Sequence, residues 1–128
     1  MNTLIISTNL NIKSKTYLLA KHTHDLFDKL CFESEVISLS DYSLPMCDGY
    51  HCYKDQQVIS LNQKIQSAKG IIICSPVYCY DLNSVAKNLM ELTGQSWNKK
   101  VVSIICNAGG EKSYMAPLSF MNSLMLDF

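Results

Sequence analysis

The chain has 128 residues, 48% of them hydrophobic, which is enough to build one compact domain over residues 1–128 and excludes a second one. Its eleven basic residues, all lysine, balance eleven acidic ones, so no charged field would attract a nucleic acid or an anionic membrane surface. The sequence shows neither a long apolar run nor the charged start of a signal peptide, which predicts a cytoplasmic protein with reduced cysteines.

Short β-rich runs alternate with longer segments of helical period, a pattern that predicts βαβ units and a parallel sheet covered on both faces. The first strand is expected over Thr3–Ser7. A polar stretch then leads to a helix for which Ser14 or Asn11 would be the N-cap. One stripe of this helix, at the 3.6-residue period typical of core packing, is formed by Leu18, Leu19, His22, Leu26, Phe27 and Leu30.

The second strand is expected over Ser34–Leu39, and a long irregular segment, Ser40–Asp55, follows it. Connections of that length are usually functional. Helical period then returns and ends at Gly70. Its apolar positions are Val58, Leu61, Ile65 and Ala68. The next strand, Ile71–Cys74, is the most apolar of the chain, which suits a central place in the sheet.

The rest of the chain predicts a third helix, a turn, a fourth strand and a fourth helix. Their expected ranges are Ser84–Thr93, Gly94–Lys99, Val101–Cys106 and Met115–Phe128. The unusual residues fall in the loops that follow strands one, three and four. Ligands of open α/β sheets bind outside the carboxyl ends of the strands, where the strand order reverses. The sequence therefore predicts a ligand site formed by these three loops.

The first loop, Thr8–Thr16, combines hydroxyl groups and two lysines with the start of a helix. Backbone N–H groups at a helix N-terminus have no partner within the helix, and the helix dipole favours negative charge there. A phosphate group suits such a loop. A polar loop with an ordinary N-cap explains the same residues equally well.

The second and third loops carry features that suit a flat ring. In the segment Ser75–Asn83, Pro76 fixes the backbone while Tyr78 and Tyr80 offer aromatic faces beside main-chain N–H groups. The alternative is a turn whose tyrosines shield the edge of the sheet. In Asn107–Gly110, two glycines would allow a ligand to approach the backbone, although glycine is common in turns for conformational reasons alone.

Taken together, these segments resemble the NADPH-dependent FMN reductase family over the whole chain. The residues that carry the resemblance are Thr8-Asn9 with Ser14-Lys15-Thr16, Ser75-Pro76-Val77-Tyr78 with Lys87-Asn88, and Asn107-Ala108-Gly109-Gly110. The spacing from Pro76 to Lys87 matches the family's Pro-Glu-Tyr-Asn motif and its following Leu-Lys-Asn without a gap. This segment is the most specific part of the resemblance.

The resemblance implies a flavodoxin-like three-layer α/β sandwich with a parallel sheet of order 2-1-3-4, the family's fifth strand being missing. It also implies FMN as cofactor and NAD(P)H as co-substrate. The FMN phosphate would be held by Thr8, Ser14, Lys15 and Thr16. The isoalloxazine ring would be lined by Pro76, Val77, Tyr78 and Cys79, with Ala108, Gly109 and Gly110 on its other border. No catalytic acid or base is implied, because hydride passes directly from nicotinamide to flavin.

The chain departs from the family pattern at three places. Ser7 and Leu10 stand where the family has Gly and Arg in the phosphate loop. Val77, Cys79 and Tyr80 replace the Glu and Asn of the second motif and the Gly that follows it. The missing fifth strand would leave the fourth strand as an exposed apolar edge, which predicts a homodimer or a larger homo-oligomer, or else an incomplete gene product.

The cysteines raise two further possibilities. Cys47, His51 and Cys52 could ligate a metal, but structural zinc needs four ligands and no second cysteine pair lies nearby, so we expect ordinary thiols and no metal. Cys74 and Cys79 could form a redox pair near a flavin. Burial in a strand explains Cys74 by itself, and Cys79 is the thiol expected to be reactive.

Two functions follow from these observations. The first is an FMN-binding NAD(P)H-dependent oxidoreductase that passes hydride to a small acceptor such as a flavin or a quinone. The second is a degenerate, non-catalytic flavodoxin-like module that serves in binding or assembly. Since the chain has no arginine to meet the additional phosphate of NADPH, an enzyme would prefer NADPH over NADH only slightly.

Overall fold

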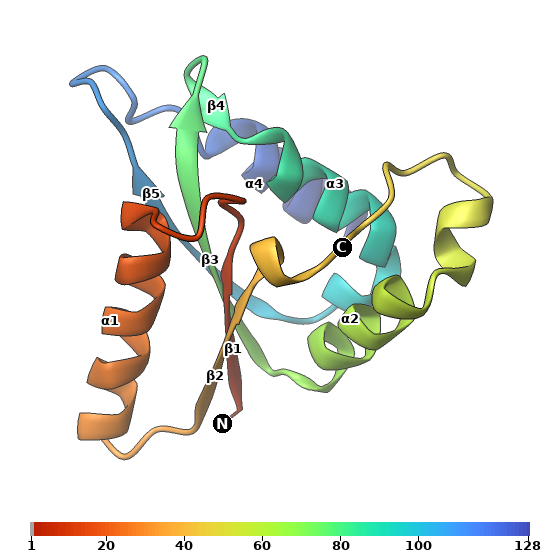
Figure 1. Cartoon of the computed structure of the whole chain (residues 1–128), viewed down its shortest axis with the longest axis horizontal. Coiled ribbons are helices and arrows are strands. Elements are labelled where there is room, and N and C mark those ends of the chain that lie inside the picture. The colour runs from red at the N-terminus through yellow and green to blue at the C-terminus, as the bar shows by residue number, and fades with distance from the viewer. Residues whose placement is uncertain (1) are drawn as a thin grey trace.

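A computed structural model describes residues 2–128 and shows a mostly parallel sheet between two helical layers (Figure 1). The long strands are β1 (Thr3–Ser7), β2 (Ser34–Ser38), β3 (Gly70–Tyr78) and β5 (Val101–Asn107). They lie in the order β2-β1-β3-β5, with all neighbours parallel. The predicted order 2-1-3-4 is confirmed, because the strand expected fourth along the chain is β5. The short β4 (Asp81–Leu82), antiparallel to the end of β3, was not expected.

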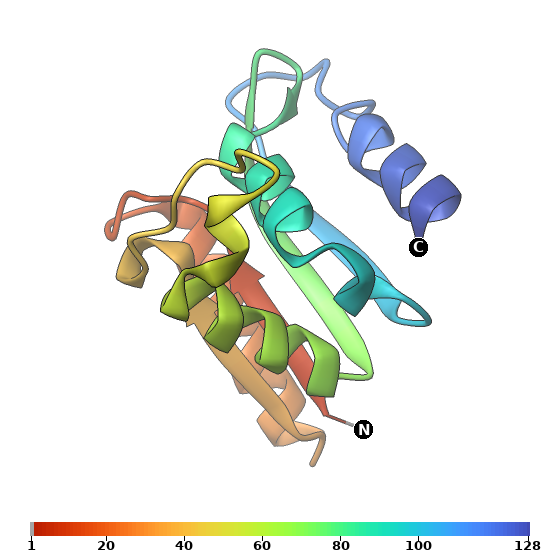
Figure 2. The same ribbon diagram turned by 90° about the vertical axis from the view of Figure 1, so that its right-hand side faces the viewer.

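The four α-helices of the described chain divide between the two faces of the sheet. They are α1 (Lys15–Lys29), α2 (Gln56–Ser67), α3 (Ser84–Thr93) and α4 (Leu118–Asp127). Figures 1 and 2 show α1 alone on one face and α2, α3 and α4 on the other. Short 3-10 helices cover Leu39–Asp41, His51–Lys54 and Gly94–Trp97. This is the flavodoxin-like arrangement of three layers that the sequence predicted.

Side-chain oxygens cap the first three helices. Ser14 accepts a hydrogen bond from the Tyr17 N–H, which decides between the two N-caps considered for α1. Asp55 caps α2 and Asn83 caps α3 in the same way. Each cap satisfies N–H groups that have no carbonyl partner within their helix, so these helices begin where the sequence places a short polar side chain.

The main core lies between the sheet and the layer of α2, α3 and α4. Alternate residues of β3, among them Ile71 and Ile73, point into it and are almost fully buried. Trp97 is also buried and meets Phe120 of α4 edge-to-face, with the ring centroids 5.9 Å apart. Through this contact between the two rings, the segment after α3 and the C-terminal helix α4 pack into the same core.

The opposite face of the sheet is covered by α1 only, and its core is much smaller. Ile5, Ala20 and Cys74 are its buried members. The predicted stripe of α1 is largely wrong, since Leu18 and Leu30 are each 64% exposed and α1 buries Thr16 and Ala20 instead. The small side chain of Ala20 lets α1 lie close to the sheet, and no second helix of the described chain lies on this face (Figure 1).

β5 forms one edge of the sheet. It pairs with β3 on one side, and within residues 2–128 no strand pairs with its other side. Val101 at its start is 67% exposed. The last helix, α4, begins at Leu118 and not at Met115 as expected: the preceding residues form turns, in which the Ala116 and Leu118 N–H groups bind the Ser113 and Met115 carbonyls.

No helix in the described part of the chain has the length and apolar character needed to cross a lipid bilayer.

Candidate cofactor-binding site

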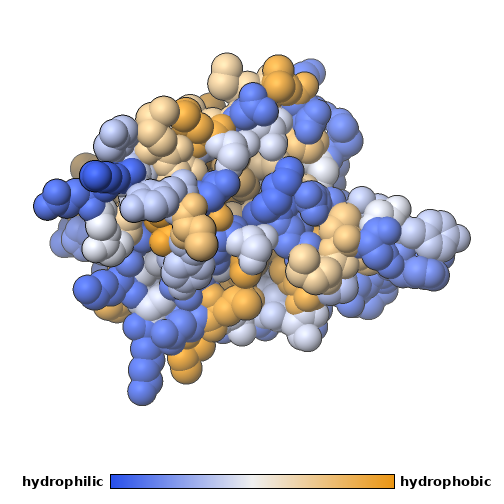
Figure 3. Space-filling view, turned by 90° about the horizontal axis from the view of Figure 1, so that it is seen from above, coloured by the Kyte–Doolittle hydropathy of each residue, from blue (hydrophilic) through white to orange (hydrophobic). Residues whose placement is uncertain are grey.

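Three loops meet at the carboxyl edge of the sheet. Ser7 at the end of β1 lies beside Cys74 of β3, and Pro76 of β3 lies beside Asn107 at the end of β5. The loops that continue from these strands therefore leave the same edge, as predicted (Figure 1). Figure 3 looks onto this end of the molecule, where apolar side chains are interspersed with polar ones.

The loop between β1 and α1 is held by its own side chains. The Thr8 N–H donates to the Cys74 carbonyl at 2.9 Å. The Asn9 side-chain oxygen accepts the Asn11 N–H at 2.9 Å, and the Asn11 side-chain oxygen accepts the Lys13 N–H at 3.0 Å. Successive Asx turns of this kind fix the loop backbone, so the start of α1 has a defined position before any ligand arrives.

Two hydroxyl groups near this helix start lack partners. The Ser7 and Thr16 hydroxyl oxygens are buried and make no hydrogen bond within the described residues. Thr16 belongs to the first turn of α1, where the backbone N–H groups have no carbonyl to bind. A buried hydroxyl without a partner is costly, and native structures rarely keep one without a reason. A phosphate oxygen would supply the missing acceptor.

Asn83 connects the loop after β1 with β3 and α3, and no sequence motif pointed to it. Its Nδ2 donates to the Thr8 carbonyl and its Oδ1 accepts the Thr8 hydroxyl, both at 2.8 Å. The same oxygen accepts the Ala86 N–H at 3.2 Å as the cap of α3 and lies 3.2 Å from the Ser75 hydroxyl. An Asn directly before a helical segment was the available signal, but only the fold shows that it reaches β1.

The segment predicted as a loop after β3 is in large part a strand. β3 continues through Ser75, Pro76, Val77 and Tyr78, so three of the residues predicted to line the ring belong to the sheet. Pro76 has no N–H to donate, and it is tolerated because it is opposite Asn107 in the last residue pair between β3 and β5. Cys79 and Tyr80 then form the two-residue turn of a hairpin between Tyr78 and Asp81.

This hairpin turn has an unusual backbone. Cys79 and Tyr80 have φ angles of +52° and +62°, so both adopt the left-handed region that side chains other than glycine and asparagine rarely enter. Two such residues in a two-residue loop define a type I′ turn, for which Asn-Gly is the preferred sequence. Tyr78 and Tyr80 are 57% and 69% exposed and stand at the edge of the site.

The third loop offers open space. Ala108, Gly109 and Gly110 are exposed, and a Cβ atom added to either glycine would meet no other atom within 4 Å. Neither glycine has a positive φ angle. Packing and turn geometry therefore do not require glycine here, which leaves room for a group that approaches the backbone from outside.

The thiols of the site differ in environment. Burial raises the pKa of Cys74 to about 12, with a smaller contribution from Cys106 across the strands. Cys79 is exposed at the hairpin tip, about 16 Å farther along the extended strand at its usual rise per residue. The two cannot act as a pair in this conformation. Within residues 2–128, no three His, Cys, Asp or Glu side chains are grouped so as to hold a metal.

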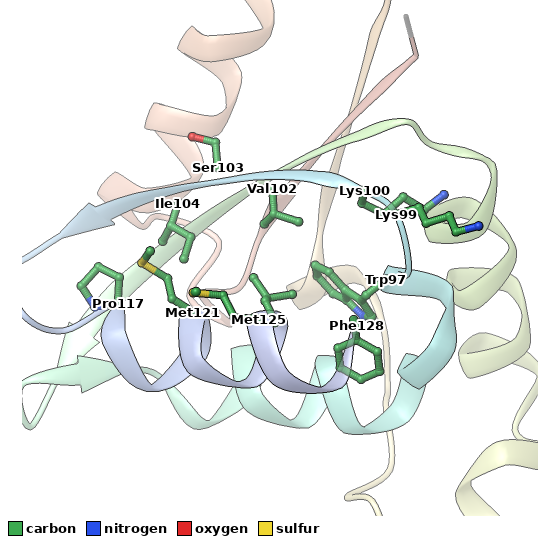
Figure 4. Close-up of a pocket in the computed structure, with 11 residues that line it drawn as sticks. Trp97, Lys99, Lys100, Val102, Ser103, Ile104, Pro117, Met121, Met125 and Phe128 are labelled. Atoms are coloured by element: carbon green, nitrogen blue, oxygen red, sulfur yellow. The ribbon is translucent and has the colours of Figure 1, made fainter.

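A cavity beside the phosphate loop has a volume of about 190 Å³ and lies between Leu10, Met46 and the start of α3 at Ser84 and Asn88. A wider one, of about 530 Å³, lies elsewhere. Figure 4 shows it between β5 and α4, where Val102, Ile104, Met121 and Phe128 line it. None of the predicted cofactor residues lines this wider cavity, so it is separate from the site at the carboxyl edge.

The sequence profile of the NADPH-dependent FMN reductase family matches residues 1–125. The chain belongs to this family. A curated relative, the NADPH azoreductase of Bacillus sp. strain OY1-2, is 26% identical over 111 residues, which are 85% of this chain and 60% of that protein. The iron-sulfur flavoprotein of Archaeoglobus fulgidus is 28% identical over 97 residues, 71% of this chain and 48% of that protein. The chain thus spans about half to three fifths of these relatives.

Solved structures show the same fold. The flavoenzyme NAD(P)H:(acceptor) oxidoreductase FerB from Paracoccus denitrificans superposes with a TM-score of 0.81 at 19% identity, covering 97% of this chain and 70% of that one. The FMN-dependent NADH-azoreductase from Bacillus anthracis, solved with FMN, gives 0.72 at 17% identity, covering 99% and 81%. At these identities the likeness establishes the fold of this FMN reductase family member and nothing finer.

The residues at the carboxyl edge of the sheet fit FMN, the cofactor that the name of the family implies. Thr16 has a buried hydroxyl without an acceptor, and the first turn of α1 presents N–H groups toward the loop. Tyr78 and Tyr80 present exposed rings, and the space around Gly109 and Gly110 is open. Cys79 and Tyr80 adopt the type I′ turn without the Asn-Gly sequence that favours it.

Proposed function

We propose that this chain binds FMN at the carboxyl edge of its sheet and acts as an NAD(P)H-dependent oxidoreductase on a small acceptor. The observation that carries the proposal is the buried, unpartnered hydroxyl of Thr16 in the first turn of α1, in a chain of the FMN reductase family. The chemistry supplied by bound FMN would be hydride transfer from reduced nicotinamide to an acceptor.

The phosphate of FMN would be bound by the loop between β1 and α1 and by the start of α1. Ser14, Lys15 and Thr16 would bind the phosphate through hydroxyl and backbone N–H groups, with the Lys15 ammonium as a point charge. Thr8 belongs to the same predicted set, and its hydroxyl already binds Asn83, so it would contribute mainly by fixing the loop.

The ring would be bordered by residues from the two neighbouring strands and their loops. Pro76, Val77, Tyr78 and Cys79 would line one border, and Ala108, Gly109 and Gly110 the other. Pro76 is buried and rigid, whereas Tyr78 is exposed and can lie against a flat ligand. The exposed setting of this border suits small planar acceptors, such as flavins or quinones, which would need access to the ring.

The cofactor is tested by adding FMN to the purified chain and following flavin fluorescence and absorbance. We expect quenching that saturates and a flavin spectrum that survives gel filtration. NADH or NADPH should then bleach the spectrum without oxygen, and a quinone should restore it. A folded chain that leaves added FMN fluorescent throughout the titration would contradict the proposal and favour the non-catalytic module.

A substitution at Thr16 tests the phosphate site directly. Thr16→Val keeps the shape of the side chain but removes the hydroxyl, so FMN affinity should fall roughly tenfold or more, as expected for a hydrogen bond to a charged group. The stability of the chain without FMN should stay the same or increase, because an unpartnered polar group is removed. Thr23→Val is the matched control, since the Thr23 hydroxyl binds the Leu19 carbonyl within the same helix. It should not change FMN affinity.

For the nicotinamide, we propose only a slight preference for NADPH. The chain has no arginine, so the additional phosphate would meet only lysine or water. Steady-state rates with NADH and NADPH at equal concentrations should differ by a small factor. A strong preference for NADPH would contradict this.

We further propose that the chain self-associates through the edge formed by β5. The edge is unpaired within the described chain, Val101 is 67% exposed, and Met125 and Leu126 of the neighbouring α4 are 79% and 77% exposed. Two copies related by a two-fold axis can bury the same apolar patch on each other. Light scattering during gel filtration should give the mass of a dimer. Replacing Val101 by Lys should shift the mass to that of one chain.

A further inference from the structure

Two thiols lie next to each other outside the proposed flavin site. The Cys47 and Cys52 sulfur atoms are 3.9 Å apart. Asp48 brings them together, because its carboxylate accepts the Tyr50 N–H at 2.9 Å and the Cys52 N–H at 3.0 Å. These hydrogen bonds fold the chain back on itself, and Gly49 provides the positive φ angle of +72° that the turn requires.

The surrounding structure holds both cysteines in place. The Cys47 N–H donates to Asn88 Oδ1 on α3 at 2.9 Å, and Asn88 Nδ2 donates to the Pro45 carbonyl at 3.0 Å. Cys52 is only 3% exposed and packs with Val58 of α2 and Leu92 of α3. The two thiols are therefore held close together by tertiary contacts as well as by the local turn.

The two cysteines differ in their access to reagents. Cys47 is half-buried and lines a cavity of about 240 Å³ together with Tyr53, Lys87 and Glu91. Cys52 lies behind it, and burial raises the pKa of its thiol. A small molecule that enters the cavity meets Cys47 first, and the sulfur of Cys52 is then the nearest thiol.

We propose that Cys47 and Cys52 form a redox-active dithiol that small disulfides oxidise to an intramolecular disulfide. The Cys47 thiolate attacks one sulfur of the small disulfide, whose S–S bond breaks and releases one thiol. The Cys52 sulfur then attacks the Cys47 sulfur and releases the second thiol. Two protons and two electrons pass from the protein to the small disulfide. The sulfur atoms, 3.9 Å apart, must approach by about 2 Å to reach bonding distance.

This inference is independent of FMN binding. It rests on the loop after β2 and on α3, and none of its groups belongs to the predicted flavin contacts. The pair is nevertheless connected to the site, because Asn88 lies one turn beyond the start of α3, where Asn83 holds Thr8. Oxidation would change the packing of Cys47 against the same helix.

Oxidised glutathione is the probe for the test. The test uses the variant Cys31→Ser as its parent protein. In this variant, Cys47 and Cys52 are the only cysteines of the tryptic peptide 30–54. After incubation with an excess of the probe and alkylation of free thiols, mass spectrometry should show this peptide with two hydrogen atoms lost and no glutathione. With Cys52→Ser in addition, Cys47 should keep a stable glutathione adduct, because the resolving thiol is gone.

Two comparisons make the result decisive. Cys74 and Cys106 lie on adjacent strands but are offset by one position and pack on opposite faces of the sheet, so they are a negative control. No peptide linking them should form. In urea the yield of the Cys47–Cys52 disulfide should fall at equal probe concentration, since the fold no longer holds the thiols together. The proposal is overturned if folded parent protein, checked by circular dichroism, accumulates a glutathione adduct on Cys47 or leaves both thiols free.

Discussion

The two sides of the carboxyl edge are built in different ways. On the phosphate side, residues 8–16 are fixed by internal hydrogen bonds, and Ser14 and Thr16 are buried. On the ring side, Tyr78, Tyr80 and the loop after β5 are exposed, and the hairpin turn holds two residues in the left-handed region. The phosphate side is thus preorganised, whereas the ring side presents exposed side chains on a strained turn.

This difference bears on how the site would select its ligands. A preorganised anion site provides affinity with little loss of conformational freedom on binding. An open ring border gives less affinity but accepts different partners, as turnover with a nicotinamide and then an acceptor requires. On the phosphate side, hydrogen bonds within the loop fix its backbone, while the first turn of α1 keeps N–H groups free for a ligand.

Asn83 joins the two sides, so its removal should have the largest effect. Asn83→Ala removes the donor to the Thr8 carbonyl, the 2.8 Å acceptor of the Thr8 hydroxyl and the side-chain cap of α3, all in a buried place. The Thr8 hydroxyl keeps only the longer 3.4 Å contact with the Cys74 carbonyl. We expect a loss of about 3 kcal/mol in the free energy of unfolding, measured by urea denaturation.

The matched control for Asn83→Ala is Asp55→Ala, which removes an N-cap of α2 outside the site. It should cost about 1 kcal/mol. Equal losses for the two variants would mean that Asn83 acts as an ordinary cap and does not join the two sides.

The hairpin on the ring side should become more stable when its turn residues are replaced. Cys79→Asn combined with Tyr80→Gly provides the preferred type I′ sequence, and we expect a gain of about 1 kcal/mol in the free energy of unfolding. FMN affinity should change at the same time, because this turn borders the proposed ring position.

Lys99 supplies a control for the hairpin variant, since it also has a positive φ angle, +59°, but lies at the opposite end of β5. Lys99→Gly should also increase the free energy of unfolding, but it should not alter FMN affinity. A destabilised hairpin variant would show that the native side chains make contacts that outweigh the backbone strain.

The smallest expected effect is a dependence of stability on pH. It distinguishes two loops that are both held by side-chain oxygens accepting backbone N–H groups. Asp48 accepts two backbone N–H groups, as Asn9 and Asn11 each accept one, but only Asp48 can be protonated. These bonds hold the pKa of Asp48 well below its ordinary value. Its stabilising contribution is therefore complete above the unfolded pKa of about 3.9 and is lost as the pH falls toward the folded pKa.

Denaturation of wild type and Asp48→Asn at neutral and at acidic pH checks this. The wild type should be the more stable at neutral pH, and the gap should narrow in acid. For Asn11→Ala, whose amide does not titrate, the gap to wild type should be the same at both pH values. A gap that stays constant for Asp48→Asn would refute the proposed role of its charge.

Much of the fold was predictable because local patterns and the buried sheet agree. The apolar run at Ile71–Cys74 predicted a central strand, and β3 lies between β1 and β5. Ser14 was one of two predicted caps and is the one that the structure uses. Parallel strands joined by helices bring their carboxyl ends to one edge, so the place of the site followed from the strand order alone.

Sequence patterns failed where a long-range contact decided the local structure. The extension of β3 through Tyr78 depends on pairing with Asn107 and β4, which no local signal around Pro76 indicates. The leucine stripe of α1 predicted burial, yet Leu18 and Leu30 are exposed, and α1 alone covers that face of the sheet (Figure 1).

By itself, the sequence indicated the family, the strand order that this resemblance implies and the three segments of the candidate site, because hydrophobic period and motif spacing are properties of neighbouring residues. Only the tertiary structure decided that Asn83 holds Thr8 across 75 positions of the chain and that α3 holds Cys47 beside Cys52. A hydrogen bond between distant residues depends on where the packed layers place them. Such contacts leave no periodic trace in the chain.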